Sequence, residues 1–399
     1  MTVLIDSILL FIAVVVSLPS LILFVEILAA FFPGNRIPSP VGFPRSKSIS
    51  VIVPAHNESS GIARTLLDIS GQLAARDSLV VVADNCTDDT ATVATSCGAN
   101  VVIRQDEARR GKGYALAFGL DYIATIQPDI VIIIDADCRV SPGTVDTLAA
   151  IVTASNRPVQ SLNLMKPPSG HERRFAVAQF AWIIRNKVRP SGLSILGLPC
   201  QLMGTGMAFP WEVIRSVDLG SSNIVEDLEL GINLACIGSS PMFCTEAVIT
   251  SEFPLTEEGV IKQRQRWEQG SLHMLLKTGL KTICTAITQQ NGSLLVLGLD
   301  MLVPPLVLQV FANVLVITTI GTLYFIGIGG VLPLAIAGTA GVLIGVSLVL
   351  SWLAFGRDAL PARQLIYVIP YLLAKLKIYK GFRADCLTEW IRSDRTKEN

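Results

Sequence analysis

The sequence is poor in charged residues. Only 16% of its 399 residues are charged, whereas 51% are hydrophobic. Soluble domains carry about 25% charged residues, so this shortfall indicates membrane segments. Basic and acidic residues balance to a net charge of zero, and the chain has neither zinc-finger spacing nor an aromatic–basic platform. We therefore expect no nucleic-acid partner.

Histidine is scarce and the cysteines are scattered. The chain has three His and eight Cys, with no Cys-x-x-Cys pair. A structural zinc site is therefore not expected. Scattered cysteines in a chain of this size fit reduced thiols on the cytoplasmic side better than a disulfide framework.

Three long apolar runs stand out. They are Ile8–Val25, Leu294–Ile320 and Val331–Phe355, and Pro304-Pro305 predicts a break in the second. About 20 apolar residues in a helix cross the hydrocarbon core of a bilayer. A cleaved signal peptide is the alternative for the first run, but no basic residue precedes it. Leu365–Leu373 is too short to span, which favours an interfacial or re-entrant segment.

Basic residues follow the first and last apolar runs. Arg36, Arg45 and Lys47 come after the first, and Arg357 and Arg363 begin a basic stretch after the last. The positive-inside rule then places the N-terminus outside and the central region inside. We expect a multi-pass protein of the cell (inner) membrane with a cytoplasmic catalytic domain.

Between the membrane runs, short apolar stretches alternate with helical ones. The predicted strands are Ile49–Val53, Leu79–Ala83, Val101–Arg104 and Ile130–Ile134, and the predicted helices are Ser60–Leu73, Asp88–Cys97 and Gly113–Ile126. This alternation predicts an α/β fold with a doubly wound, mostly parallel sheet.

The second half of this region is less regular. It suggests helices over Glu172–Arg189 and Glu226–Cys236 and a strand over Leu202–Phe209. Gly259–Leu280 reads as an amphipathic helix, lying either along the membrane or on an ordinary protein surface.

Val131–Asp137 is the most informative stretch. Four β-branched residues, typical of a buried parallel strand, run directly into Asp135-Ala136-Asp137. Ligands bind at the carboxyl ends of strands in open α/β sheets. Two carboxylates there suit Mg²⁺ or Mn²⁺, although an ordinary polar turn is the alternative.

Four further motifs carry polar groups in an ordered series. They are Pro54-Ala55-His56-Asn57-Glu58 with Asp84-Asn85, the basic loop Arg109–Gly113, Val225-Glu226-Asp227, and Gln263-Arg264-Gln265-Arg266-Trp267. Strand-end polar groups could read a nucleotide, and a carboxylate could act as a general base. An indole face could stack on a sugar and an Arg could neutralise a diphosphate. Polar loops, helix caps and an amphipathic helix are the structural alternatives.

Together these motifs resemble membrane-bound family 2 glycosyltransferases, the branch of the cellulose, chitin and hyaluronan synthases. The resemblance covers roughly Ile49 to Leu280 and implies a GT-A type fold with one N-terminal and two C-terminal transmembrane helices. It implies the domains 1–33 (transmembrane helix), 34–48 (linker), 49–285 (cytoplasmic glycosyltransferase), 286–356 (two transmembrane helices) and 357–399 (interfacial segment and basic tail).

The resemblance also implies roles for individual residues. Asp227 matches the catalytic base, and Asp135 and Asp137 match the pair that binds the donor diphosphate through Mg²⁺ or Mn²⁺. The donor-binding set is Pro54, His56, Asn57, Glu58, Asp84, Lys112, Asp135, Ala136 and Asp137. The acceptor-binding set is Gly204, Thr205, Gly206, Glu226, Gln263, Arg266 and Trp267.

The sequence departs from the family pattern at three places. Ala83 stands where a second Asp is usual, Val225 where Thr is frequent, and Pro210-Trp211 where basic residues are common. These departures leave the donor sugar and the acceptor open.

The resemblance implies inverting transfer from a nucleotide sugar, with a UDP-sugar as the expected donor, to a glycan or polyprenyl-linked acceptor in exopolysaccharide or cell-surface glycan synthesis. A processive synthase that exports its polymer is the alternative, but three helices enclose a polar path poorly unless an oligomer or export partner completes it. A non-catalytic nucleotide-sugar-binding subunit and a transporter are rivals of other classes.

Overall fold

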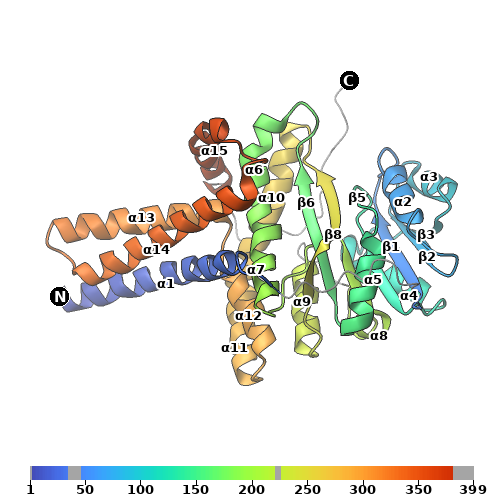
Figure 1. The fold of residues 1–399 in the computed structure, drawn as a ribbon, viewed down its shortest axis with the longest axis horizontal. Helices are drawn as coiled ribbons and strands as arrows, with labels where there is room; N and C mark the ends of the chain where they lie inside the picture. The colour runs from blue at the N-terminus through green and yellow to red at the C-terminus, as the bar shows by residue number, and fades with distance from the viewer. Residues whose placement is uncertain (1, 35–45, 221–225, 381–399) are drawn as a thin grey trace. The chain divides into compact units, whose positions relative to one another are not determined.

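The computed structural model describes residues 2–34, 46–220 and 226–380, which divide between two compact units (Figure 1). The sheet unit contains strands β1–β8 with helices α2–α5, α8 and α9, and the helical unit contains α1, α6, α7 and α11–α15. Helix α10 (Glu257–His273) begins in the first and ends in the second. Most of the predicted linker, Val225 and the tail beyond residue 380 lie outside the described residues.

The sheet unit is built on eight strands in the order β3-β2-β1-β4-β7-β6-β8-β5. They are β1 (Ile49–Ala55), β2 (Ser78–Asp84), β3 (Asn100–Arg104), β4 (Ile130–Ile133), β5 (Arg139–Val140), β6 (Val159–Lys166), β7 (Met207–Pro210) and β8 (Met242–Glu252). The four strands β3-β2-β1-β4 are parallel, β7 is antiparallel to both its neighbours, β6 pairs parallel with β8, and β5 pairs antiparallel with β8. The predicted α/β sheet is confirmed, and it is a mixed one.

Helices cover both faces of the sheet (Figure 1). One face packs on α2 (Ile62–Ser70), α3 (Thr90–Ser96) and α5 (Thr144–Ser155), and the other on α4 (Lys112–Ile123), α8 (Trp211–Ile214) and α9 (Glu226–Cys236). Successive side chains of a strand point to opposite faces, so Val51 and Val53 enter the first core whereas Ile52 enters the second. The strands are buried on both sides, which explains their unbroken apolar runs.

One predicted strand begins later than expected. Leu202–Phe209 was expected to be extended throughout, but β7 starts only at Met207. Gly204 and Gly206 have φ angles of +82° and +66°, in the left-handed region that a β-strand does not use. The segment before β7 is therefore a loop, and it lies beside the end of β4 because Met207 pairs with Ile133.

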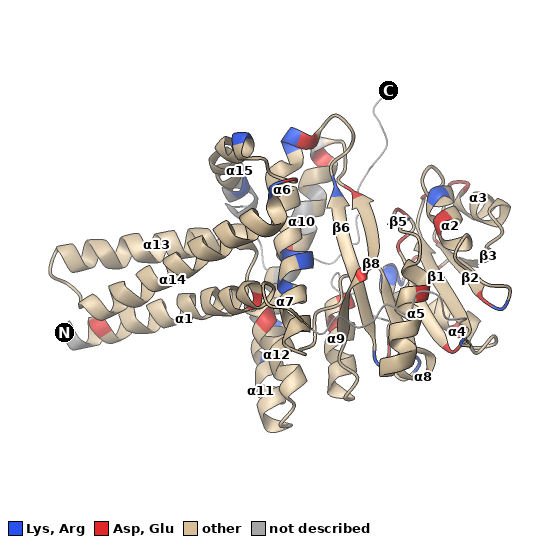
Figure 2. Cartoon of the chain, viewed as in Figure 1, with Lys and Arg blue, Asp and Glu red and all other residues tan. Residues whose placement is uncertain are grey.

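The helical unit contains three helices that are long and apolar enough to cross a membrane. They are α1 (Thr2–Ala29), α13 (Leu306–Phe325) and α14 (Val331–Ser351), which continues in a π-helical turn to Gly356. Charged residues are sparse along α1, α13 and α14 (Figure 2). The predicted break at Pro304-Pro305 is confirmed, because α12 (Gly292–Met301) ends before it and α13 begins after it.

Two predicted helices are interrupted by wider turns. The helix expected over Glu172–Arg189 is α6 (Glu172–Ile183), a π-helical turn, and α7 (Arg189–Ile195). The helix expected over Gly259–Leu280 is α10, a π-helical turn (Met274–Gly279) and the start of α11 (Leu280–Thr288). Apolar periodicity alone does not reveal such turns, since each adds only one residue to a helical repeat.

The C-terminal end of the described helical unit is a 3₁₀ turn (Ala362–Tyr367) followed by α15 (Val368–Lys380). Ile366, Ile369 and Leu373 on this segment are exposed.

Candidate active site

Asp135 and Asp137 follow β4 at the carboxyl edge of the parallel strands. Their turn is held from below by Thr65, whose hydroxyl lies 2.8 Å from the carbonyl oxygen of Ala136 and 2.7 Å from that of Cys138. One oxygen of each Asp and the Cys138 sulfur all lie within 4.8 Å of one another. The predicted pair of carboxylates is thus brought together, with a thiol beside it.

Lys112 begins helix α4 and reaches this turn. Its Nζ lies 2.5 Å from Asp135 Oδ1 and donates a 2.6 Å hydrogen bond to the carbonyl oxygen of Gly204. Burial lowers the pKa of the Lys112 ammonium, but Asp135, Glu226 and Asp227 outweigh burial and raise that pKa above its usual value. Lys112 is therefore a permanent positive charge among carboxylates.

The Gly204-Thr205-Gly206 loop forms the next wall of the site. The Thr205 hydroxyl accepts a 3.0 Å hydrogen bond from the backbone N–H of Asp135, and the N–H of Gly206 donates to the carbonyl of Ile133 at 2.9 Å. A Cβ at Gly204 would lie 3.5 Å from Asp227 Oδ2 and 3.6 Å from Lys112 Nζ. Because Gly204 has no side chain, it leaves room between the Lys112 ammonium and the Asp227 carboxylate.

Glu226 and Asp227 start helix α9, where a helix dipole favours negative charge. The Oδ1 atom of Asp227 accepts a 2.9 Å hydrogen bond from the backbone N–H of Leu228. Burial, opposed by Lys112 and reinforced by Asp227, raises the pKa of Glu226 to about 7. Both adjacent carboxylates thus interact with Lys112, and Glu226 binds its proton more tightly than a free glutamate does.

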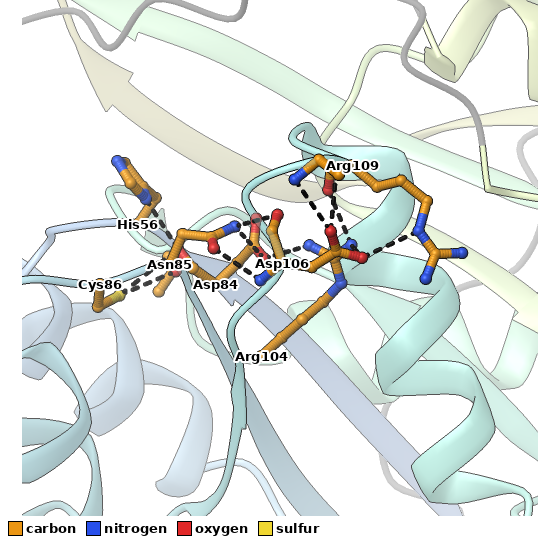
Figure 3. A network of polar contacts seen from close by, with 9 residues as sticks. His56, Asp84, Asn85, Cys86, Arg104, Asp106 and Arg109 are labelled. Atoms are coloured by element: carbon orange, nitrogen blue, oxygen red, sulfur yellow. Dashed lines mark hydrogen bonds and ion pairs between the residues drawn. The ribbon is translucent and has the colours of Figure 1, made fainter.

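A second polar cluster lies at the ends of β1 and β2 (Figure 3). His56 Nδ1 lies 2.7 Å from the carbonyl oxygen of Asp84, as expected from the parallel pairing of these strands. The Asp84 carboxylate forms a 2.6 Å ion pair with Arg104 and accepts a 3.0 Å hydrogen bond from Asn85. The predicted donor residues His56 and Asp84 are therefore neighbours.

Asn57 and Glu58, also predicted to bind the nucleotide-sugar donor, form hydrogen bonds that involve backbone N–H groups. Asn57 has a φ of +55°, and its side-chain oxygen accepts a 2.7 Å hydrogen bond from the N–H of Thr87. The N–H of Glu58 donates to the Thr90 hydroxyl at 2.8 Å. Pro54 is half-buried in β1 and Ala136 is buried. The side chains of proline and alanine are hydrocarbon, so neither residue could donate a hydrogen bond from its side chain.

The Gln263–Trp267 motif lies on α10, where the chain passes between the units. Gln263 is buried in the sheet unit. The Trp267 ring packs on that of Trp182 in the helical unit, with centroids 4.8 Å apart. The side chain of Arg266 lies outside the described part of the chain.

Two buried residues of the site were not expected. Gln160 on β6 donates to the carbonyl of Thr205 at 2.9 Å and accepts from the N–H of Met203 at 2.8 Å, so it holds the glycine loop. Arg104 closes β3 and binds Asp84. The only signal for Arg104 is a charge at the end of the apolar run Val-Val-Ile, and Gln160 has no local signal.

Comparison with known proteins agrees with this geometry. The family described as glycosyltransferase-like family 2 matches residues 44–270, more than half of the chain. The chain belongs to glycosyltransferase family 2. Its sheet, its carboxylate turn after β4 and its acidic start of α9 all lie within the matched region.

Two curated relatives show how far the sequence likeness extends. An uncharacterized glycosyltransferase of Mycobacterium tuberculosis is 37% identical over 123 residues, which are 29% of this chain and 52% of the relative. A probable glycosyltransferase of Bacillus subtilis, YdaM, is 26% identical over 247 residues, 57% of this chain and 56% of the relative. The chain therefore spans about half the length of the curated relatives it matches.

A mannosyltransferase of Pyrobaculum calidifontis, solved with GDP-Man and Mn²⁺, has a similar fold. It superposes with a TM-score of 0.55 at 18% identity, covering 86% of this chain and 98% of its own. This likeness concerns the fold.

The carboxylate turn of this family 2 glycosyltransferase fits a divalent cation. Asp135 and Asp137 supply hard oxygen ligands of the kind that Mg²⁺ and Mn²⁺ prefer, and their spacing allows both to reach one ion. Three carboxylates, those of Asp135, Glu226 and Asp227, interact with the single ammonium of Lys112 in this region.

Proposed function

We propose that this glycosyltransferase moves a sugar from a UDP-sugar to a hydroxyl of a lipid-linked or growing glycan, in exopolysaccharide or cell-surface glycan synthesis. The transfer is a single displacement that inverts the anomeric centre. The observation that carries the proposal is the meeting of Lys112, Asp135 and Asp227 around the bare backbone of Gly204. Groups for leaving-group charge and for proton removal thus share one small space.

The donor side uses Asp135, Asp137 and Lys112. The two carboxylates would hold Mg²⁺ or Mn²⁺, which when bound offsets charge that develops on the departing diphosphate. The Lys112 ammonium lies 2.5 Å from Asp135 Oδ1 and is positioned to bind a diphosphate oxygen. His56 and Asp84 at the neighbouring strand ends would face the nucleoside, with Asp84 accepting from uracil.

Asp227 is the proposed general base. The positive end of the α9 dipole and the hydrogen bond from Leu228 keep one oxygen fixed, while Oδ2 points towards the Gly204 backbone. An acceptor hydroxyl placed there would give its proton to Asp227 as its oxygen attacks the anomeric carbon. The glycine loop, Glu226, Gln263, Arg266 and Trp267 are the proposed acceptor contacts.

We further propose that the protein is a multi-pass protein of the cell (inner) membrane with its catalytic region on the cytoplasmic side. Support comes from three apolar helices, α1, α13 and α14, and from the exposed apolar side chains near α15, which would lie at the membrane surface. The proposed division remains 1–33, 34–48, 49–285, 286–356 and 357–399, in the order anchor, linker, catalytic domain, two spans and interfacial tail.

Single transfer is favoured over polymer export by the packing of the apolar helices. Ser20 of α1 accepts hydrogen bonds from Gln309 and Asn313 of α13, at 3.4 and 3.3 Å, and all three are buried. These polar side chains contact one another in the interface between α1 and α13, which is closely packed at this point. A processive synthase would need an oligomer or an export partner.

The test is nucleotide release from a panel of UDP- and GDP-sugars by the full chain in membranes, with and without Mn²⁺. Asp227→Asn should lower turnover about 10²- to 10⁴-fold because a general base is lost, while UDP binding is kept. Asp121→Asn, an exposed carboxylate on α4, is the matched control and should have no effect. Near-normal turnover of Asp227→Asn would show that Asp227 is not the general base. A long ladder of products would show that the enzyme polymerises and would contradict single transfer.

A further inference from the structure

Arg104 is a buried guanidinium at the carboxyl end of β3. Its side chain is only 8% exposed, and it donates to Asp84 Oδ1 at 2.6 Å, to Asp106 Oδ2 at 3.1 Å and to the carbonyl oxygen of Arg109 at 2.8 Å. Figure 3 shows Arg104 between Asp84 at the end of β2 and the loop that carries Asp106 and Arg109. The guanidinium therefore fixes a carboxylate on one side and a loop on the other.

The loop side of the network is satisfied within itself. Asp106 accepts from the backbone N–H groups of Ala108 and Arg109 and from Arg109 Nε, at 3.1, 3.0 and 2.9 Å. The N–H of Asp106 donates to Asn85 at 2.9 Å. This loop leads directly into Lys112, so losing Arg104 would also disturb the diphosphate end of the site.

Among the described residues, the contacts to the Asp84 carboxylate are made at one of its two oxygens. Both hydrogen bonds that its side chain accepts from described residues, from Arg104 and from Asn85, end at Oδ1. An oxygen with two lone pairs is saturated by two such bonds. Oδ2 is left as the oxygen that a ligand can use.

We propose that Arg104 is a positioning residue that makes the donor site selective for a uracil-type base. Uracil and thymine present one ring N–H, at N3, between two carbonyl oxygens, and Oδ2 matches that single donor. Guanine presents two adjacent donors, N1–H and the N2 amino group, which pair best with both oxygens of a carboxylate. By occupying Oδ1, Arg104 removes the second acceptor that guanine needs.

This inference rests on the proposed function, because it requires Asp84 to face the donor base. It also accounts for the departure at Ala83. With one Asp at this strand end instead of two, base selection depends on how that one carboxylate is oriented, and Arg104 and Asn85 set its orientation.

The experiment measures dissociation constants of UDP, 3-methyl-UDP and GDP for the full chain with Mn²⁺, by calorimetry in detergent. Methylation removes the N3–H alone and leaves the diphosphate unchanged. The wild-type protein should bind UDP at least about tenfold more tightly than either other nucleotide, as expected for one hydrogen bond to a charged group. In Arg104→Met the preference for UDP, measured as the dissociation constant of 3-methyl-UDP divided by that of UDP, should fall towards one. Arg104→Lys should retain part of this preference.

Arg157→Met is the matched control. Arg157 is a partly buried guanidinium that binds the Ser240 carbonyl at 2.9 and 3.0 Å just before β6, and its loss should leave the ratio unchanged. A merely structural Arg104 would weaken UDP and 3-methyl-UDP equally, and that result would overturn the inference.

The wild-type measurements decide the matter even where a variant does not fold. If wild type binds UDP but methylation costs nothing, or if GDP binds as tightly as UDP, the selectivity of Asp84 is refuted while the proposed function survives. If it binds no nucleoside diphosphate, the proposed function and this inference fall together.

Discussion

Both units contain a buried basic side chain that contacts carboxylates, and Arg189 of the helical unit and Lys112 of the sheet unit can be compared directly. In the helical unit, Arg189 of α7 contacts Glu26 of α1 and Asp300 of α12, each at 2.5 Å. In the sheet unit, Lys112 contacts Asp135 and the backbone of Gly204. Both are charges removed from water, so both need partners.

The difference lies in the cation and in the elements that hold it. The planar guanidinium of Arg189 joins three helices in a fixed geometry. A Cβ at nearby Gly192 would overlap the Glu26 carbonyl, so the backbones of α7 and α1 are in close contact where they cross. Lys112 is a point charge on a flexible stem, and its partners stand on loops at strand ends. We infer that the first arrangement holds a structure and the second serves a reaction.

The largest expected effect comes from removing the structural charge. Arg189→Met leaves Glu26 and Asp300 buried without their partner, which should lower the free energy of unfolding by about 3–5 kcal/mol. The measurement is the thermal midpoint in one detergent, together with UDP affinity, which should be unchanged. Arg173→Met, an exposed arginine on α6, is the control. A midpoint equal to that of the control would mean that the Arg189 cluster does not stabilise the fold.

The next largest effect is expected from removing the charge of Lys112 in the sheet unit. Lys112→Met should weaken UDP binding about 10- to 100-fold, because a charged hydrogen bond to the diphosphate is lost. Its thermal midpoint should change far less than that of Arg189→Met. Lys47→Met, which removes an exposed partner of Asp129, serves as the matched control. If Lys112→Met bound UDP normally but unfolded early, Lys112 would belong with Arg189.

The smallest effect concerns pH. Burial, with Asp227, raises the pKa of Glu226 from 4.5 to about 7, so the folded protein holds this proton more tightly than the unfolded chain. The contribution to stability is fully present below pH 4.5 and is lost as pH rises through about 7. In metal-free buffer, the thermal midpoint of the wild type minus that of Glu226→Gln should fall as the pH rises from 4.5 to about 7. Glu212→Gln, at an exposed site, should show no such trend, and a flat difference for Glu226→Gln would contradict the raised pKa.

The sequence predicts some parts of this protein well because their cause is local. Runs such as Val131–Ile134 are β-branched and buried on both faces, and the carboxylates after them lie at the strand end for that reason. The break at Pro304-Pro305 follows from the proline ring itself. The family match confirms the glycosyltransferase predicted from the order of the motifs.

Other parts depend on partners far along the chain. Strands β6 and β8 pair across 80-odd residues, and the glycine loop takes its shape from Gln160, more than 40 residues before it. The π-helical turns leave the apolar repeat almost unchanged. The roles assigned to Asp227 and to the Gln263–Trp267 motif stay predictions.

Gly206 shows how little space this loop leaves for a side chain. A side chain at this position would overlap the hydroxyl of Ser161 on β6 and crowd Ile249, in a backbone conformation that L-residues rarely adopt. Shrinking Ser161 alone would leave the backbone conflict, and a new residue at 206 alone would collide with Ser161. Any single substitution at position 206 therefore meets two separate obstacles, one in the neighbouring strand and one in its own backbone.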